Sequence, residues 1–413
     1  MTGPMGMPFR ALDMPDQPRL KLSSIVILGS LAGLPPLAID LYLPALPSLT
    51  RGLHAAASSG QLTLTGFVAG LAFGQLVAGA LSDAHGRRAP LIVGLIGYVA
   101  ATALCAVAPS IWLLAVVRVV AGATGGAGVV IGRAIVRDTY GGTAAARVFA
   151  LMLLVTGAAP VVAPLIGGEL LRLTDWRGLF VALAAAGALQ LGAVVALLAE
   201  TLPAAARHRG GLRLTLGRFG GLLANRRFVA DAGALNLAFG ALFAYISASS
   251  FVLEDIYRTS PQLYGLIFAL LAAVFVAVAQ IGGRLVVRVG ARRLFRLGLH
   301  AIALASIGAL VSIAVGGGLA ALVCCLALVN AGNGFVWPNG TAVSMADMGE
   351  VAGSASALLG VGQFGVAALV APLVGVAGSR AALPAGVVMC VCGVGGWLLY
   401  LTGGRSSGML ARR

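Results

Sequence analysis

The sequence predicts an all-α membrane protein in which twelve transmembrane helices form two pseudo-symmetric six-helix bundles. Hydrophobic residues make up 59% of the 413-residue chain and charged residues only 10%, whereas a soluble protein carries about 25% charged residues. The apolar residues form long continuous runs rather than the short alternating strands of an outer-membrane barrel. Two motifs of the first half also recur in the second half.

Twelve apolar runs approach the length of about 20 residues that a spanning helix needs. They cover residues 21–47, 59–81, 89–108, 111–134, 147–170, 178–199, 228–252, 262–285, 294–315, 319–344, 352–375 and 382–403. The longest polar segment, from Glu200 to Arg227, separates the two sets of six. We therefore expect a cytoplasmic tail over 1–20, a bundle over 21–200, a linker over 201–226, a second bundle over 227–404 and a tail over 405–413.

The internal repeat is visible in two places. The loops Gly79–Arg88 and Gly283–Arg293 both have Leu two residues and Gly seven residues after the first Gly, followed by paired arginines. Ala163–Gly167 reads Ala-Pro-Leu-Ile-Gly, and Ala371–Gly375 reads Ala-Pro-Leu-Val-Gly. Related halves of this kind place a substrate site at mid-depth between them.

The distribution of basic residues predicts the orientation in a bacterial inner membrane. The net charge of +15 is spread over short loops, which argues against a nucleic-acid surface. If the N-terminus is cytoplasmic, only five of the 28 basic residues lie outside, at Arg51, Arg172, Arg177, Arg258 and Arg380. The positive-inside rule therefore predicts that both termini are cytoplasmic. The linker arginines either bind anionic lipid head groups or simply anchor a solvated loop.

Cysteine and histidine give no sign of a metal or catalytic site. Cys105, Cys324, Cys325, Cys390 and Cys392 all fall in apolar runs, without a paired spacing. They are expected to be free, small hydrophobic side chains. The four histidines are scattered, and residues 1–20 do not resemble a cleaved signal peptide.

Asp40 is the candidate proton site. It lies in the first apolar run, in the stretch Leu-Pro-Pro-Leu-Ala-Ile-Asp-Leu-Tyr-Leu-Pro, with no basic residue nearby in sequence. A carboxylate at bilayer depth costs about 2.5–3.5 kcal/mol, and desolvation disfavours its charged form. Pro35 and Pro36 remove two backbone donors, so the helix is expected to kink or break near the acid. The alternative is a structural acid that caps a broken helix or pairs with a neighbour.

These features resemble the major facilitator superfamily and, more narrowly, the Bcr/CflA (bicyclomycin/chloramphenicol resistance) branch of its drug:proton antiporters. The matching segments are Ala38–Pro44, Gly79–Arg88, Arg133–Asp138, Glu200–Pro203, Phe243–Ser249 and Ala352–Leu358. The antiporter signature of the fifth helix usually has Gly before its Pro, and this chain has Ala163. That departure weakens the antiport assignment slightly.

The resemblance implies roles for three groups of residues. It links Arg118, inside the fourth predicted helix, to proton coupling. We expect Arg118 to lower the cost of ionising Asp40. The alternative is an arginine that is satisfied by backbone carbonyls. It implies a conformational latch that holds the two halves together, although plain anchoring by arginines is the simpler interpretation. The expected latch residues are Gly79, Asp83, Gly86, Arg87, Arg88, Arg137 and Asp138, and the antiporter-motif residues are Pro160, Pro164, Gly167 and Gly168.

Polar and aromatic side chains at membrane depth are candidates for a substrate cavity. They are Tyr42, Gln61, Asn236, Tyr245, Asn330, Asn333 and Trp337. The equally weighted alternative for each is an interhelical contact that only holds helices together. Gly122, Gly126, Gly128 and Gly132 give two Gly-x-x-x-Gly spacings, which favour close helix packing over a phosphate loop.

The expected function is proton-coupled efflux of small, largely hydrophobic compounds by alternating access. Apolar walls, a few hydrogen-bonding groups and one acid suit such a substrate. Exporters of a sugar, amino acid or organic acid, uptake instead of export, and a membrane-embedded enzyme or receptor are the alternatives. We expect a monomer that is not an enzyme and needs no cofactor because the proton gradient drives it. Its partners would be the substrate, protons and membrane lipid, without nucleic acid.

Overall fold

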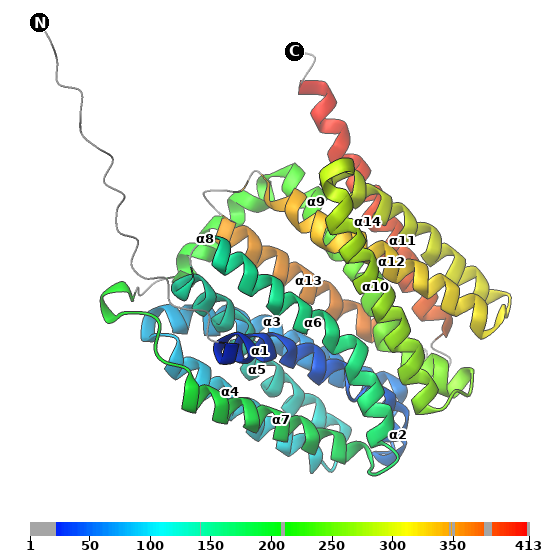
Figure 1. Cartoon of the computed structure of the whole chain (residues 1–413). Helices are drawn as coiled ribbons and strands as arrows, with labels where there is room; N and C mark the ends of the chain where they lie inside the picture. Colours follow the sequence, from blue (N-terminus) through cyan, green and yellow to red (C-terminus); the bar gives the residue numbers. More distant parts are fainter. Residues whose placement is uncertain are drawn as a thin grey trace, which may run out of the picture.

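A computed structural model describes residues 22–140, 142–207, 211–346, 348, 352–375 and 382–410. The predicted tail over residues 1–20 lies outside this range. Every regular element within the described ranges is a helix, which confirms the all-α class. Figure 1 shows the helices as one closely packed bundle.

Each half of the chain supplies one set of long helices. The first half contains α1 (Leu22–Asp40), η1 (Leu43–Ala45), α2 (Leu46–Gly52), α3 (Ala57–His85), α4 (Arg88–Ala106), α5 (Ile111–Thr139), α6 (Gly142–Leu170) and α7 (Trp176–Leu197). The linker contains η2 (Ala204–Ala206) and α8 (Gly211–Ala224). The second half contains α9 (Arg226–Ser250), η3 (Phe251–Ile256), α10 (Pro261–Val289), α11 (Ala291–Ala314), α12 (Gly318–Met345), α13 (Ala352–Gly375) and α14 (Ala382–Leu410).

The long helices correspond to the twelve apolar runs. Among the described residues, ten helical segments are long and apolar enough to cross a membrane. Two shorter apolar stretches, Val155–Leu170 in α6 and Leu358–Val374 in α13, account for the remaining two runs. The structure therefore has the composition and helix lengths of a multi-pass membrane protein.

The helices pack first within each half and then across the boundary. α5 packs against α3 and α4, and α1 packs against α6. In the second half α12 packs against α10 and α11, and α9 against α14. The halves meet where α3 packs against α13 and α6 packs against α10, as Figure 1 shows.

Glycine sets the close approach of α3 and α5. A Cβ on Gly122 would strike the backbone carbonyl of Phe67, and a Cβ on Gly126 would lie 3.0 Å from the backbone nitrogen of Gln75. A Cβ on Gly132 would instead meet its nearest side chains at 3.9 Å, which is ordinary contact. The first Gly-x-x-x-Gly spacing therefore allows backbone contact between the helices.

Three boundaries differ from the expected ones. The first apolar run is not one helix, because α1 continues through Pro35 and Pro36, ends at Asp40 and is followed by the short η1 and α2. The linker contains a helix of its own, α8. The last helix continues to Leu410, through residues 405–410 of the expected tail.

The two ends of the bundle are distinguished by their loops. The arginine-rich end carries the α3–α4 loop, the α10–α11 loop and α8, and the sequence predicts that it faces the cytoplasm. The opposite end carries α2, η3 and the start of α10.

Candidate functional site

Asp40 lies buried at the point where α1 stops. It is the last residue of α1 and is 4% exposed. In the described part of the chain, its carboxylate makes no hydrogen bond or ion pair. The negative end of a helix dipole lies at the C-terminus, so this position disfavours a carboxylate charge in addition to the cost of desolvation. A carboxylate charge at this position is therefore costly.

Arg118 of α5 binds the same helix end. Its guanidinium Nη2 donates to the carbonyl oxygen of Ala38 at 3.1 Å. The last carbonyls of a helix lack partners within the helix, so a buried cation satisfies this one. The guanidinium carbon also lies 4.1 Å from the Phe67 ring centroid and 4.5 Å from that of Tyr42. Arg118 is only 1% exposed and is held by these three groups.

Arg118 contacts the backbone near Asp40 rather than the carboxylate itself. This contact is the alternative that the sequence left open, an arginine satisfied by a backbone carbonyl. The reason is local, because α1 ends at Asp40 and leaves the Ala38 carbonyl free at the end of the helix. That Arg118 lowers the cost of ionising Asp40 stays a prediction, and it requires a geometry other than this one.

Three of the expected cavity residues lie close to this helix end. Tyr42 is fully buried, and its hydroxyl lies 3.4 Å from the Thr63 hydroxyl. Gln61 of α3 donates from Nε2 to the carbonyl oxygen of Ser247 at 3.1 Å, which joins the two halves. The Tyr245 hydroxyl and Gln61 Oε1 are buried without a partner in the described part of the chain. These polar groups line the boundary between the halves.

Tyr264, which the sequence analysis did not identify, also belongs to these polar residues at the boundary between the halves. It is fully buried on α10, and its hydroxyl lies 2.9 Å from the Ser249 hydroxyl. Asp40 lies within electrostatic range of both Tyr264 and Tyr245. Tyr264 is the third residue of the apolar run 262–285, and the packing of α10 against the first half brings it inward.

The remaining expected cavity residues do not meet at Asp40. Asn330 and Asn333 donate to carbonyls one turn earlier in α12, at 2.9 and 3.0 Å. Trp337 packs edge-on against a phenylalanine of α9, with ring centroids 5.3 Å apart. Asn236 lies against Gly362 of α13. The Trp337 and Asn236 contacts join helices of the second half, whereas the two asparagine bonds stay within α12.

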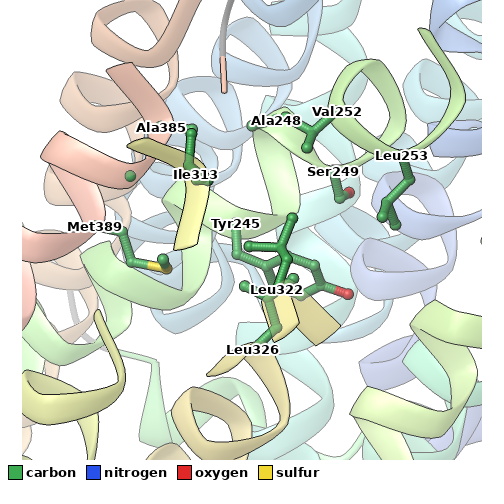
Figure 2. A pocket seen from close by; sticks show the side chains of 11 residues that line it. Tyr245, Ala248, Ser249, Val252, Leu253, Ile313, Leu322, Leu326, Ala385 and Met389 are labelled. Carbon is green, nitrogen blue, oxygen red and sulfur yellow. The ribbon is translucent and has the colours of Figure 1, made fainter. Parts of the chain in front are cut away.

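The best-formed cavity lies inside the second half, as Figure 2 shows. It has a volume of about 30 Å³ and is lined mainly by apolar side chains of α9, η3, α11, α12 and α14. Tyr245 is the one expected cavity residue in its lining. A space of this size holds water-sized molecules, so it differs from the larger cavity expected between the halves.

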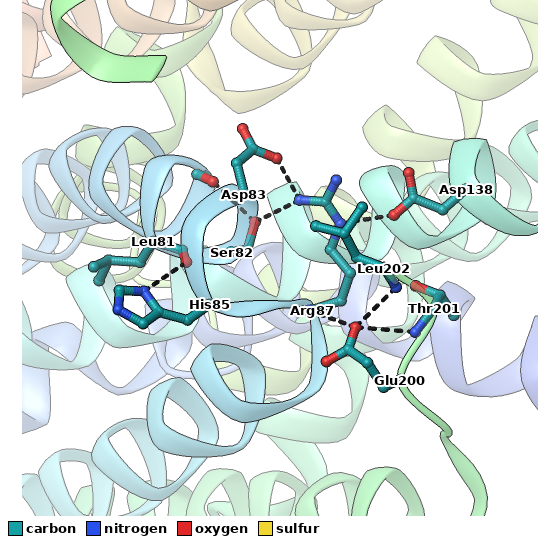
Figure 3. A network of polar contacts seen from close by, with 10 residues as sticks. Leu81, Ser82, Asp83, His85, Arg87, Asp138, Glu200, Thr201 and Leu202 are labelled. Carbon is teal, nitrogen blue, oxygen red and sulfur yellow. Dashed lines mark hydrogen bonds and ion pairs between the residues drawn. The ribbon is translucent and has the colours of Figure 1, made fainter. Parts of the chain in front are cut away.

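Arg87 is the centre of a polar network at the arginine-rich end, shown in Figure 3. Its Nε donates to Asp138 at 2.7 Å, and its Nη1 donates to Asp83 and to the Ser82 hydroxyl. Burial alone would lower the pKa of Arg87, but the hydrogen bonds and ion pairs with Asp138 and Asp83 raise it. Arg87 is therefore a permanent cation that joins α3, α4 and α5.

Glu200 joins the same loop to the end of α7. Its carboxylate accepts from the backbone N–H of Arg87 at 2.8 Å, of Arg88 at 3.2 Å, and of the two residues that follow it. Burial alone would raise the pKa of Glu200, but these backbone donors outweigh it and lower the pKa. Gly86 has a φ of 92°, and a Cβ there would strike Glu200. The sequence analysis did not identify this role of Glu200, although Glu200–Pro203 is one of the segments that carry the family resemblance.

The expected latch is thus a network within one half. Asp83, Arg87, Arg88 and Asp138 are bonded to α3, α5 and α7 and not across the boundary. The physical reason is that Glu200 and Asp138 offer acceptors closer to the loop than any in the second half. Gly79 makes an ordinary contact with α5, and Arg137 is exposed outside the network.

The end of α6 packs against both α1 and α10. Pro160 and Pro164 lie inside this helix. A Cβ on Gly167 would strike the carbonyl oxygen where α1 breaks. The carbonyl oxygen of Gly168 accepts from Nε2 of Gln262 at 3.0 Å, across the boundary between the halves. The antiporter-motif residues therefore lie on the interface beside the Asp40 helix end.

An ion pair joins the two halves at the end of the bundle opposite the arginine-rich end. Arg51 Nη1 of α2 lies 3.0 Å from Asp255 Oδ1 of η3. The two residues are 204 positions apart, the same spacing as the Gly79 and Gly283 loops. The pair therefore joins equivalent positions of the repeat. Together with the Gln61 and Gln262 bonds, it holds the halves closed at this end.

Two helical halves that close at one end around a buried acid define a membrane transporter. Residues 28–372 match the family model of the Major Facilitator Superfamily. The chain belongs to this superfamily, whose members are transporters and not enzymes.

Similar proteins of known sequence and structure agree with this assignment. The chain is 35% identical to the uncharacterized MFS-type transporter YdgK of Bacillus subtilis, over 92% of this chain and 95% of that protein. It is 29% identical to a bicyclomycin resistance protein homolog of Haemophilus influenzae, over 91% and 94% of the two chains, which supports the Bcr/CflA resemblance. The fold matches an inward-facing bacterial homolog of the human lysosomal transporter Spinster, with a TM-score of 0.72, 17% identity and coverage of 92% and 96%.

Proposed function

We propose that the protein is a proton-coupled exporter of small, largely hydrophobic compounds in the bacterial inner membrane. The observation that carries the proposal is Asp40, a buried carboxyl group without a partner in the described residues, at a helix break between the two halves. An intramembrane acid without a cation is costly and marks a proton or ion path.

The coupling follows from competition between a proton and the substrate. With the arginine-rich end open, Asp40 releases its proton to the cytoplasm and substrate binds between the halves. The halves then rock, and a proton from outside returns to Asp40 and favours release of the substrate. The membrane potential supplies about 2.3 kcal/mol per charge per 100 mV, which sustains a gradient of about fiftyfold for a neutral substrate.

The substrate class follows from the groups near Asp40. Tyr42, Gln61, Tyr245 and Tyr264 offer hydrogen bonds but no fixed charge, and the cation beside Tyr42, Arg118, is bound to the Ala38 carbonyl. Such a lining suits a compound that is mostly apolar with a few polar groups. The bicyclomycin resistance relative makes bicyclomycin a suitable first probe.

Susceptibility of cells tests the proposal. Cells without their own drug exporters, expressing the protein, are expected to survive several-fold higher concentrations of bicyclomycin or chloramphenicol than cells with an empty vector. Asp40→Asn is expected to remove this protection at equal membrane abundance. Glu169→Gln, which changes an exposed acid at the opposite end, is the control that retains it. Increased susceptibility would indicate uptake, and equal protection by Asp40→Asn would contradict the proton site.

A further inference from the structure

Glu254 is a second acid within a membrane-spanning segment. It lies in η3, a π-helical turn over Phe251–Ile256 that continues α9 at the opposite end. Such turns are rare and are frequent at functional sites. Glu254 is half-buried, and its Oε1 is buried without a hydrogen-bond partner in the described part of the chain. The expected helix ended at residue 252, so the sequence placed this acid in a loop.

The neighbours of Glu254 do not neutralise it. Arg51 of α2 is the nearby cation, but it is bonded to Asp255 at 3.0 Å. Asp255 adds a second carboxylate beside Glu254, and Tyr264 of α10 lies within electrostatic range of Glu254. Burial and a like-charged neighbour both disfavour a carboxylate charge, so this site favours binding of a proton from outside.

Buried hydroxyl groups lie within electrostatic range of both acids. Tyr264 is within range of Glu254 and Asp40, and its hydroxyl is 2.9 Å from that of Ser249. The Tyr245 hydroxyl is within range of Asp40 and has no partner in the described residues. Further buried oxygens without partners there belong to Gln61, Ser250 and Thr259. Buried polar atoms of this kind are the usual positions of ordered water.

We propose that Glu254 is the outer proton acceptor and that it supplies Asp40 through the hydroxyls of Tyr264, Ser249 and Tyr245. A proton from external water binds the Glu254 carboxylate. Each hydroxyl then accepts one proton on its oxygen and releases its own, and the Asp40 carboxylate accepts the last one. The inference rests on the proposed function, because it supplies the proton that displaces the substrate.

The test measures how fast Asp40 becomes protonated from outside. The full-length protein is reconstituted in proteoliposomes, the external pH is lowered rapidly, and the infrared band of the protonated Asp40 carboxyl is followed in time. The band is assigned by its loss in Asp40→Asn. Glu254→Gln and Tyr264→Phe are expected to slow its appearance by about tenfold or more, since a positioned proton donor contributes about 10²–10⁴-fold. Glu254→Asp is expected to restore part of the rate.

The controls separate this path from a structural role of Glu254. Glu169→Gln is expected to keep the wild-type rate, and the Glu254, Tyr264 and Glu169 variants are expected to reach the same final band intensity as wild type. Tyr264→Phe removes only a hydroxyl, so it tests the path even if Glu254→Gln folds poorly. A wild-type rate in both Glu254→Gln and Tyr264→Phe would overturn the path. A band that Asp40→Asn leaves unchanged would instead contradict the proposed function itself, and the path with it.

Discussion

At the scale of single residues, acids take different roles according to the donors around them. Glu200 receives four backbone N–H groups and is stabilised as a carboxylate. Asp231 is 3% exposed and pairs with Arg292 at 2.8 Å. Asp40 has neither kind of partner in the described part of the chain. The same chemical group therefore serves as a structural hydrogen-bond acceptor in Glu200, an ion-pair partner in Asp231 and a candidate proton site in Asp40.

The contribution of Glu200 is expected to depend on pH. Its pKa is lowered in the folded protein, so its stabilisation is present above the ordinary glutamate pKa of about 4.3 and is lost as the pH falls through the folded pKa. Glu200→Gln is therefore expected to lower the melting temperature at neutral pH and to differ less from wild type as the pH falls below about 4.3. Thermal unfolding in detergent, measured from pH 3.5 to 7.5, checks this. A constant difference across that range would contradict it.

Residue types in the sequence identified some of these roles but not their partners. Asp40 was recognisable because no cation lies near it in sequence. The partner of Arg118 was not predictable, since the free Ala38 carbonyl exists only because α1 ends at Asp40. Tyr264 and Glu254 were missed because both lie near the ends of apolar runs, where the sequence does not show how deep in the membrane a residue lies.

At the scale of elements, the close contact of α3 and α5 depends on particular glycines. Gly122 and Gly126 face the backbone of α3, whereas Gly132 faces side chains of α1 and α6 at ordinary distances. A side chain can rotate away from an added methyl group, but a helix backbone cannot without moving the helix. The two Gly-x-x-x-Gly spacings of α5 therefore differ in importance.

Gly122→Ala is expected to destabilise the protein, and Gly132→Ala is not. The added methyl at position 122 overlaps the Phe67 carbonyl, and overpacking of this kind costs about 1–3 kcal/mol. At position 132 the nearest atoms are 3.9 Å away, so alanine is expected to be neutral or slightly stabilising, because glycine is the weaker helix former by about 1 kcal/mol. Thermal unfolding of the two purified variants measures the difference. Equal melting temperatures would show that α3 and α5 adjust freely.

The elements were predictable where hydrophobic length decided them. All twelve apolar runs correspond to helices, since bilayer thickness fixes how long such a run must be. The break near Asp40 was expected from Pro35 and Pro36, but the helix α8 and the π-helical turn were not predicted. Each of these depends on tertiary contacts at the ends of the bundle rather than on apolar length.

At the scale of the whole molecule, the two halves are closed at the opposite end by contacts across the boundary. The sequence repeat predicted two related halves, and the Arg51–Asp255 pair joins equivalent positions of that repeat. The repeat did not predict which ends would touch. That choice reflects the conformational state of the transporter, which composition and spacing do not encode.

The Arg51–Asp255 pair is expected to favour the state closed at that end. Arg51 is mostly exposed, with 66% of its side chain accessible, and exposed pairs contribute about 0.2–1 kcal/mol. Arg51→Asp is therefore expected to raise the open-to-closed ratio by up to about fivefold, and the double variant with Asp255→Arg to restore it. Distances between spin labels at exposed positions 48 and 263 report the ratio. Arg172→Asp, which breaks an ion pair within one half, is the control, and an effect of equal size there would contradict a specific gate.

The most direct test of the central claim measures coupled transport in proteoliposomes that contain only this protein. A proton gradient is imposed, and accumulation of radiolabelled bicyclomycin against its concentration gradient is recorded for wild type and Asp40→Asn. We expect wild type to accumulate the compound only while the gradient lasts. We expect Asp40→Asn to exchange labelled for unlabelled compound but to accumulate none. Gradient-driven accumulation by Asp40→Asn at the wild-type level would contradict the assignment of Asp40 as the coupling residue.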